Sequence, residues 1–270
     1  MLHKVIDPTL IKFRAFQAKK SKFIPKVTFE IPSGRYLVKT ASNDRELREA
    51  LELRYQVFLK EGLNKRTPYR VDVDRFDFLA DHLLIIDQEE SRIVGTYRLI
   101  SSLFSDHFYS QTEFHLDGIL DLPGVKLELG RACTASDMRS GIAIALLWRG
   151  IANYIQAIKA DYLFGCASVK VTDPSTIHQL SSILRAEGHL IDDYDVTALP
   201  SYKVPAANST STPIDDCQEL IPSLLRSYFK AGAKVCGEPA LDKDFHCIDY
   251  LTLLNTRSMN ESFERRYKLC

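Results

Sequence analysis

A turn near residue 141 has the composition of a phosphate-binding site. A strand-like run, Lys126–Thr134, leads through small and polar residues at 135–140 into an apolar helical run at 142–160, with Gly141 between them. The unpaired backbone N–H groups and the dipole at a helix N-terminus favour an anion there. The pattern therefore indicates a site for a phosphorylated group, although an ordinary strand-to-helix turn has the same composition.

Two other stretches accompany this turn, residues 95–99 (GTYRL) and 127–132 (LELGRA). With the turn, they resemble the GNAT superfamily of acyltransferases, which implies a mixed, largely antiparallel sheet flanked by helices. An acyltransferase that acts on an amine needs a cradle for the acyl donor and a group that takes a proton from the incoming ammonium. It also needs a hydrogen bond to the developing oxyanion.

The turn matches the GNAT pattern only in part. That pattern is Arg/Gln-x-x-Gly-x-Gly/Ala, and it holds the phosphopantetheine of the donor. Gly141 and Ala143 match the last two positions, but Met138 occupies the first and the arginine stands one place later, at Arg139. The resemblance implies that Arg139, Ser140 and Gly141 bind an acyl-phosphopantetheine thioester as substrate, with no separate cofactor. The displaced arginine favours acyl carrier protein over coenzyme A as the donor.

Four patterns occur in the same order as in acyl-homoserine-lactone synthases. They are an arginine–phenylalanine pair, two acids, a glycine-to-arginine stretch and a glutamate-to-arginine stretch, here Arg54 and Phe58, Asp74 and Asp77, Gly95 to Arg98, and Glu128 to Arg131. Residues 146–151, 162–168 and 232–240 are similar instead to hemolysin-like GNAT proteins. That set includes ornithine N-acyltransferases of ornithine-lipid synthesis and N-acyl amino acid synthases. The resemblance covers roughly residues 35 to 255.

Under this resemblance the charged residues have separate tasks. Glu128 is the expected general base, acting directly or through a water, with Arg131 at the same catalytic centre. Because residues three apart on a strand face opposite sides, both can serve one site only if the strand is irregular there. Asp74 and Asp77 would hold the acceptor's ammonium, and Arg98 with Arg131 would bind its carboxylate. A purely structural network of these acids and arginines is the alternative.

Arg54 and Phe58 are expected to bind the donor or its acyl chain. Because they are four apart on a predicted helix, they share one face. A place in the hydrophobic core is an equally good interpretation of Phe58.

Covalent catalysis is not indicated. His82 and Asp87 have the His-x4-Asp spacing of glycerolipid acyltransferases, but the β-type run between them places positions five apart on opposite faces. The sequence has no Gly-x-Ser-x-Gly elbow, and none of its six cysteines has a context typical of a nucleophile. Direct attack of an amine on a thioester is therefore favoured. The cysteines form no CxxC pair and no cluster with histidine, so no metal site is expected.

Strands and helices alternate along the chain. Strands are expected at 35–40, 82–87, 92–101, 126–134, 162–168, 233–237 and 246–254, and helices at 44–60, 142–160, from 174 and at 221–230. Asn43 and Asp44 are the cap candidates of the helix at 44–60, and Asp173 with Pro174 opens the helix from 174. A Pro/Ser/Thr/Asn-rich excursion occupies 199–213. The pattern predicts an α/β (α+β) fold, with one acyltransferase domain at 35–270 and an elaborated C-terminal half.

The first 34 residues form a basic, amphipathic arm. Lysines and arginines surround an apolar stripe made by Leu10, Ile11, Phe13 and Phe16. Such a segment can rest on an anionic membrane surface, or it can pack its phenylalanines on the domain. With no signal peptide and no run of about eighteen apolar residues, we expect a cytoplasmic protein, peripheral at the inner face of the membrane. No nucleic-acid partner is expected.

Together these features predict an N-acyltransferase that moves a long-chain (3-hydroxy)acyl group from acyl carrier protein to the α-amine of an amino acid. Ornithine is the first expected acceptor, and lyso-ornithine lipid would then be the product. The nearest alternatives are an N-acyl amino acid synthase and an acyl-homoserine-lactone synthase. An alternative of another class is a non-catalytic GNAT-like protein that binds lipid or a partner.

Overall fold

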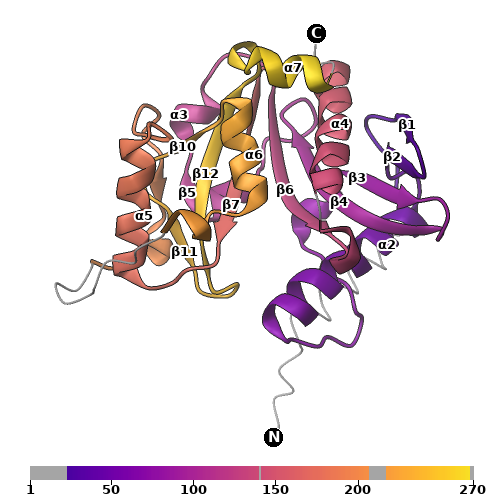
Figure 1. The fold of residues 1–270 in the computed structure, drawn as a ribbon, viewed down its shortest axis with the longest axis horizontal. Coiled ribbons are helices and arrows are strands. Elements are labelled where there is room, and N and C mark those ends of the chain that lie inside the picture. Colours follow the sequence, from indigo (N-terminus) through magenta and orange to yellow (C-terminus); the bar gives the residue numbers. More distant parts are fainter. Residues whose placement is uncertain (1–22, 140, 207–216, 268–270) are drawn as a thin grey trace, which may run out of the picture. The chain divides into compact units, whose positions relative to one another are not determined.

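The computed structural model of the chain describes residues 23–139, 141–206 and 217–267 (Figure 1). The chain forms two compact units. The first combines Met1–Ile100 with Arg131–Tyr154, and the second combines Ser101–Gly130 with Ile155–Cys270. Strand β6 (Lys126–Thr134) and helix α4 (Gly141–Ile158) each contribute residues to both units. The apolar stripe predicted in the N-terminal arm lies outside the described residues.

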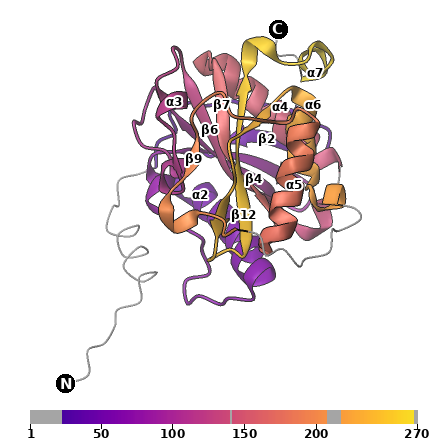
Figure 2. The same ribbon diagram turned by 90° about the vertical axis from the view of Figure 1, so that its left-hand side faces the viewer.

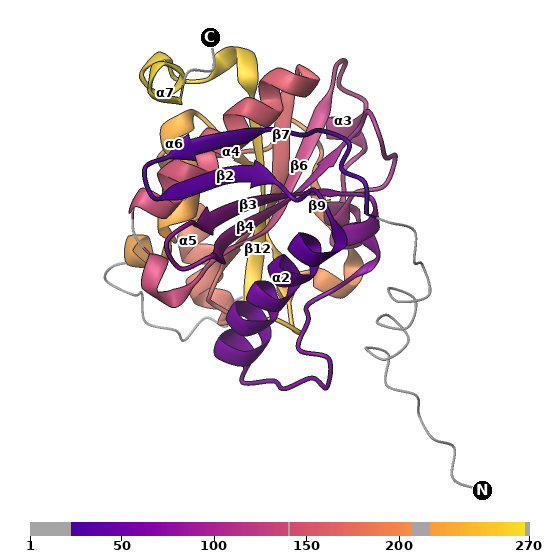
Figure 3. The same cartoon turned by 90° about the vertical axis from the view of Figure 1, so that its right-hand side faces the viewer.

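Four strands of the first unit form an antiparallel meander in the order β1-β2-β3-β4 (Figure 3). They are β1 (Glu30–Ser33), β2 (Tyr36–Thr40), β3 (Asp81–Asp87) and β4 (Arg92–Ser101). β1 falls inside the segment predicted as an arm, and β3 and β4 are the predicted pair. Their register sets His82 opposite Arg98, which fixes the position of that arginine.

The helix predicted at residues 44–60 is α-helical only over its first part. α2 (Asp44–Arg54) begins at Asn43, whose side chain accepts the backbone N–H of Glu46 at 3.0 Å, as expected of a cap. From Tyr55 to Gly62 the chain continues as a π-helix, η1. π-helical turns are rare and occur frequently at functional sites. Here the change from α-helical to π-helical backbone hydrogen bonding begins at the residue after Arg54.

Two helices pack on the strands of the first unit. α2 contributes Ala50 to a core cluster with Leu84 and Ile93. α4 approaches β2 and β3 closely at Gly150, where a Cβ would lie 2.4 Å from Leu83 Cδ1. By length and composition α4 alone, among the described residues, could cross a membrane, but more than half of it is buried inside the structure. That burial is typical of a core helix. Two short helices, η2 (Arg75–Phe78) and η4 (Ser136–Met138), complete the unit.

The second unit is built on strands from distant parts of the chain. Their order is β6, β7 (Tyr162–Val169), β12 (Cys247–Asn255), β10 (Lys234–Cys236) and β8 (Leu190–Ile191), with β11 (Ala240–Asp242) paired to β12. The β6–β7 and β10–β8 pairs are parallel and the others antiparallel. β5 (Phe114–His115) and β9 (Thr197–Ala198) form a separate pair. The predicted mixed, largely antiparallel α/β architecture is confirmed.

Helices α5 (Pro174–Ala186) and α6 (Ser223–Ala231) run beside β12 (Figure 2). Asp173 caps α5 as predicted, because its carboxylate accepts the backbone N–H of Thr176 at 2.9 Å. Ser181 of α5 shares a 2.9 Å hydrogen bond with the Tyr250 hydroxyl of β12. The shorter helices are α3 (Asp117–Leu120), η3 (Tyr109–Thr112), η5 (Pro200–Tyr202), η6 (Cys217–Leu220), η7 (Thr256–Ser258) and α7 (Glu261–Tyr267).

Candidate active site

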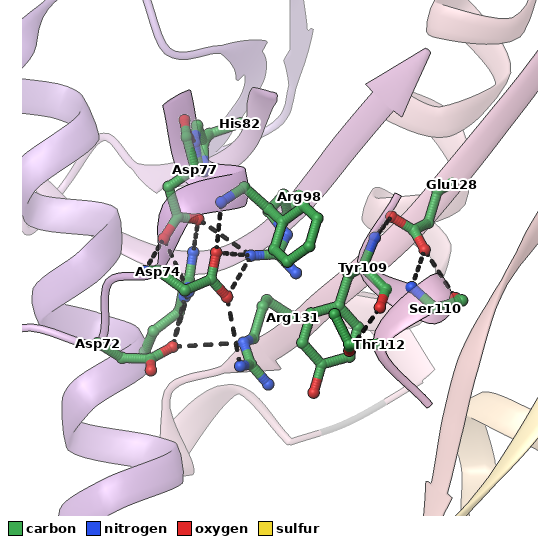
Figure 4. A network of polar contacts seen from close by, with 12 residues as sticks. Asp72, Asp74, Asp77, His82, Arg98, Tyr109, Ser110, Thr112, Glu128 and Arg131 are labelled. Carbon is green, nitrogen blue, oxygen red and sulfur yellow. Dashed lines mark hydrogen bonds and ion pairs between the residues drawn. The ribbon is translucent and has the colours of Figure 1, made fainter. Parts of the chain in front are cut away.

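Six charged side chains of the first unit form one network of ion pairs (Figure 4). Its members are three aspartates and three arginines: Asp72, Asp74, Asp77, Arg54, Arg98 and Arg131. All but Asp72 were singled out from the sequence. Because opposite charges are present in equal number, the groups can be buried together at a far lower cost than separately.

Arg54 and Asp77 are the buried centre of this network. Arg54 donates from Nη1 to Asp77 Oδ1 at 2.6 Å and from Nε to Asp72 Oδ2 at 2.8 Å. The side chains of Arg54 and Asp77 are each 1% exposed. Arg54 therefore connects the end of α2 to the segment that carries the three aspartates, residues 72–77, which we call the acidic loop. A contact between Arg54 and the acyl donor stays a prediction. Phe58, one turn further along η1, is half-buried, which is compatible with either of its predicted roles.

Asp74 and Arg131 are the more exposed edge of the network. Arg98 Nη1 donates to both carboxylate oxygens of Asp74 at 2.8 Å, and Arg131 Nη2 lies 3.4 Å from Asp74 Oδ2. The exposed fraction is 17% for the Asp74 side chain and 16% for that of Arg131, against 1% for Arg98. A ligand that approaches the network would meet Asp74 and Arg131 before the buried members.

The acidic loop adopts this shape because its carboxylates cap a short helix. Asp74 Oδ1 accepts the backbone N–H of Phe76, and Asp77 Oδ2 accepts that of Asp74, both at 2.8 Å. This reciprocal capping box fixes both aspartates at the start of η2. Burial acts to raise the pKa of Asp74, but the three guanidinium groups of the network hold it well below its usual range. The Asp74 carboxylate is therefore ionised at neutral pH.

Arg131 interrupts the regular geometry of β6. Its φ is +53°, in the left-handed region that residues other than glycine rarely adopt. The parallel ladder between β6 and β7 pairs Lys126–Glu128 with Tyr162–Phe164 and ends there. At the next position of β7, a Cβ on Gly165 would lie 2.1 Å from the Leu129 carbonyl oxygen. The strand is thus irregular directly after Glu128, as a shared role for Glu128 and Arg131 requires.

The Glu128 carboxylate binds the start of helix η3 within the second unit (Figure 4). Its Oε2 accepts the backbone N–H of Tyr109 at 2.7 Å, and its Oε1 accepts the N–H and hydroxyl of Ser110 at 2.7 and 2.6 Å. Glu128 is 2% exposed. Three donors stabilise the ionised carboxylate and fix its position. Its role as the base stays a prediction.

The turn predicted to bind the donor's phosphate joins β6 to α4. Met138 is buried in η4, and Arg139 is exposed and pairs with Glu61 of η1 at 2.5 Å. α4 begins at Gly141, where an added Cβ would meet open space. Ser140 lies outside the described residues. No packing against the protein requires glycine at position 141, which suits a backbone that a ligand approaches closely.

His82 and Asp87 do not pair, as the strand pattern predicted. His82 Nε2 lies 3.2 Å from the carbonyl oxygen of Asp77, whereas Asp87 binds Arg35. Burial lowers the pKa of His82 to about 4, so its imidazole is neutral at physiological pH. The two residues therefore do not form the histidine–aspartate base of glycerolipid acyltransferases.

Sequence reasoning missed three residues of these networks. Asp72 stands two positions before Asp74, on the same side of an extended segment, so its spacing was an available signal. Tyr109 and Ser110 reach Glu128 across a separation of 19 and 18 residues. No local pattern connects them to that glutamate.

Comparison with known proteins shows which family the chain resembles. Residues 53–149, which hold every member of the charged network and Glu128, match the acetyltransferase (GNAT) domain. The chain is 32% identical over 251 residues to an L-ornithine N(alpha)-acyltransferase of Brucella abortus (strain 2308), covering 87% of this chain and 89% of that protein. The corresponding enzyme of Rhizobium meliloti (strain 1021) is 31% identical over 232 residues, 79% of this chain and 78% of that one.

A solved structure shares the fold. The crystal structure of TofI in a ternary complex with an inhibitor and MTA has a TM-score of 0.50 at 13% identity, and the match covers 87% of this chain and all of that one. This likeness concerns the fold alone, whereas the two relatives extend the sequence relationship beyond residues 53–149 and over most of the chain. The chain is an acyltransferase and belongs to the L-ornithine N(α)-acyltransferase family of GNAT proteins.

Proposed function

We propose that the chain transfers a long-chain (3-hydroxy)acyl group from acyl carrier protein to the α-amine of ornithine, giving lyso-ornithine lipid. The observation that best supports ornithine as the acceptor is the 32% identity to the Brucella abortus enzyme, because the similarity extends over 87% of this chain. A relationship of that extent includes far more than the donor-binding core that GNAT proteins share.

The reaction forms one bond and breaks another at the thioester carbonyl. The ammonium loses one proton, and the neutral amine attacks this carbon, so that the C–N bond forms; the nitrogen then loses a second proton, to solvent, as the amide forms. The C–S bond then breaks, and the sulfur leaves on the phosphopantetheine arm and takes up a proton. Glu128 would accept the proton of the ammonium, directly or through a water, and return it to the departing sulfur.

The acceptor's own charges suit the exposed edge of the first network. Arg131 can bind a carboxylate in bidentate geometry, and Asp74 can accept hydrogen bonds from an ammonium. A zwitterionic amino acid would then replace their mutual 3.4 Å contact with one contact to each of its charges. Arg98 and Asp77 are too deeply buried for an incoming acceptor to contact them first. Their effect on acceptor binding would be to hold Asp74 in place.

The donor would bind at the turn before α4. The backbone at Gly141 and the side chains of Arg139 and Ser140 would hold the single phosphate of phosphopantetheine. Arg139 would exchange its contact with Glu61 for that phosphate. Phe58 and Arg54 stay the candidates for the acyl end of the donor. Acyl carrier protein is acidic, and basic residues near the turn would speed its association.

The product is an amphiphile that needs a membrane to receive it. The basic arm, residues 1–34, is the candidate contact with the inner membrane face of a cytoplasmic enzyme. Removal of residues 1–22 should weaken sedimentation with anionic vesicles and leave turnover of a short, soluble acyl donor in place. Unchanged vesicle binding would exclude this role for the arm.

The decisive experiment uses purified protein, 3-hydroxyacyl-acyl carrier protein and each amino acid in turn, with the product identified by mass spectrometry. The proposal requires an N-acylornithine and a higher kcat/KM for ornithine than for other acceptors. The variant Glu128→Gln tests the base, and Glu187→Gln, which makes the same change at an exposed helix end, is the matched control. Preferential acylation of another amino acid would overturn the acceptor assignment.

A further inference from the structure

A second group of acids lies buried in the second unit. Glu113 follows η3, Asp242 ends β11 and Asp249 lies on β12. Their exposed fractions are 0%, 7% and 4%. Cys166 of β7 and Cys247 of β12 lie among them with free thiols. We refer to Glu113, Asp242 and Asp249 as the acid cluster.

The acid cluster differs from the first network in its partners. In the described part of the chain, neither Glu113 nor Asp242 forms an ion pair with a basic side chain. The Oε1 atom of Glu113 is buried and has no hydrogen-bond partner there. Buried carboxylates normally have partners, because an unsatisfied polar group costs free energy. A buried carboxylate oxygen without a partner, within a group of acids, therefore makes the acid cluster a candidate site for a cationic ligand.

The geometry lets one cation contact several of these groups. The ligand atoms of Asp242, Cys247 and Asp249 all lie within 4.8 Å of one another. Glu113 interacts with Asp249 both by charge and through a side-chain hydrogen bond. Asp242 Oδ1 and Asp249 Oδ1 already accept hydrogen bonds from the backbone of the β11–β12 turn and from Ser168, so both carboxylates are held in place.

A short chain of contacts connects the acid cluster to the predicted base. The Cys166 thiol lies 3.6 Å from Glu113 Oε2 and donates to Ser110 Oγ at 3.4 Å. The Ser110 hydroxyl in turn donates to Glu128 Oε1 at 2.6 Å. All four residues belong to the second unit. Glu128 and the acid cluster are therefore parts of one polar region.

We propose that the acid cluster binds the side-chain ammonium of a diamino acid acceptor and so selects ornithine over neutral amino acids of the same length. This inference rests on the proposed function, in which Glu128 takes a proton from the acceptor's other amine. An ammonium group carries three N–H donors and no acceptor, which suits a cluster of three buried acids in which Glu113 and Asp242 have no basic partner among the described residues. A residue built to bind the ammonium would also explain why Glu113 keeps an unpaired oxygen when the ligand is absent.

Proton binding supports this assignment. Burial and the neighbouring Asp249 raise the pKa of Glu113 to about 8. Without a ligand, the carboxyl is therefore mostly protonated at neutral pH, and an arriving ammonium must displace that proton. Calorimetric titration in buffers of different ionisation enthalpy would detect the released proton.

The test compares ornithine with norvaline, which has the same carbon chain and no side-chain amine. In the parent, kcat/KM should be much higher for ornithine. Glu113→Gln should lower the ornithine-to-norvaline ratio of kcat/KM by about 10- to 100-fold, the loss expected for one charge-assisted hydrogen bond. Asp244→Asn removes one charge from an exposed position of the same turn and is the matched control; it should keep the parent ratio.

An unchanged ratio in Glu113→Gln overturns the proposal while acyl transfer itself stands. Should the variant not fold, Asp249→Asn replaces it under the same criterion. If no amino acid is acylated, the proposed function fails, and calorimetry still decides this inference: ornithine must bind more tightly than norvaline, with proton release, only when Glu113 is present. Stoichiometric binding of Zn²⁺ alone, abolished by Cys247→Ser and without any ornithine preference, would show a metal site and overturn the inference.

Discussion

The two buried acidic groups of this protein differ in how their charge is balanced. In the first unit, three aspartates meet three arginines, and Arg54 and Asp77 pair at 2.6 Å with 1% exposure each. In the second unit, Glu113 and Asp242 meet no basic side chain among the described residues. The charges of the first group balance without a ligand, whereas the second group has an excess of acids and a buried Glu113 oxygen with no hydrogen-bond partner in the described chain. A charge-balanced network stabilises the fold, and a group with excess negative charge is the better candidate for binding a cation.

This difference reverses the expected effect of removing a charge. Loss of one partner from a balanced buried pair leaves the other uncompensated and typically costs about 3–5 kcal/mol. Loss of one carboxylate from a group of acids removes repulsion and desolvation instead. Substitutions in the two groups should therefore move stability in opposite directions.

The largest effect is expected at Glu128, on the chemical step. Glu128→Gln keeps the shape of the side chain and removes the base, and loss of a general base typically costs about 10²–10⁴-fold in rate. Thiol release from an acyl carrier protein thioester measures this. Because the carboxylate also holds Tyr109 and Ser110, the melting curve must be recorded alongside. A rate equal to that of the parent in a folded variant would remove Glu128 from the mechanism.

Next in size is a substitution at the centre of the balanced network. Asp77→Asn leaves the network with three arginines and two aspartates, and Arg54 keeps Asp72 as a partner but loses its most buried one, so unfolding should become easier by about 3–5 kcal/mol, or roughly 6–20 °C in melting temperature. Differential scanning calorimetry measures this. Asp106→Asn makes the same change at an exposed position, and its melting temperature should stay close to that of the parent. Equal melting temperatures for the two variants would mean that the network does not support the fold.

The sequence predicted one of these two groups far better than the other. The spacing of Asp74 and Asp77 is local, and the capping box at η2 gives both aspartates a position that depends on few distant residues. The cap at Asn43 and the strand Lys126–Thr134 were also predicted from local patterns. The long-range clustering of acids was not predicted, because no local pattern near Glu113 indicates that β11 and β12 place two more acids beside it. Likewise, the π-helix after Arg54 interrupts an unbroken helical pattern.

A smaller effect, opposite in sign, is expected at Glu113. In the unfolded chain the pKa of the Glu113 carboxyl is near its ordinary value of 4.5, whereas in the folded protein it is about 8. Between these values the unfolded state binds fewer protons, so the free energy of unfolding falls as pH rises, by at most about 1.4 kcal/mol per pH unit. Above pH 8 no further loss occurs from this group.

Melting temperature against pH, measured without ligand, checks this. Between pH 5 and 8 the parent should lose stability relative to Glu113→Gln, which cannot ionise at this position and should be the more stable protein at pH 8. The titratable groups that interact with Glu113 are Asp242, Asp249, the hydroxyls of Tyr109 and Tyr202, and the thiols of Cys166 and Cys247. Parallel curves for the two proteins would show that Glu113 has a counterion in solution, and the contrast between the two acidic groups would disappear.

The smallest effect on stability is expected at a pair that belongs to neither group. Arg139 and Glu61 meet at 2.5 Å, but their side chains are 52% and 32% exposed, and exposed ion pairs contribute only about 0–1 kcal/mol. Arg139→Ala should therefore leave the melting temperature nearly unchanged.

The effect of Arg139→Ala should appear in the KM for the acyl carrier protein donor, because the proposed phosphate contact is lost. The difference in KM from the parent should shrink at high salt, as screening weakens that contact. Glu61→Gln removes the same ion pair and keeps the guanidinium, so it should not raise that KM. If both variants raise it equally, Arg139 acts by shaping the turn through Glu61 and does not bind the phosphate.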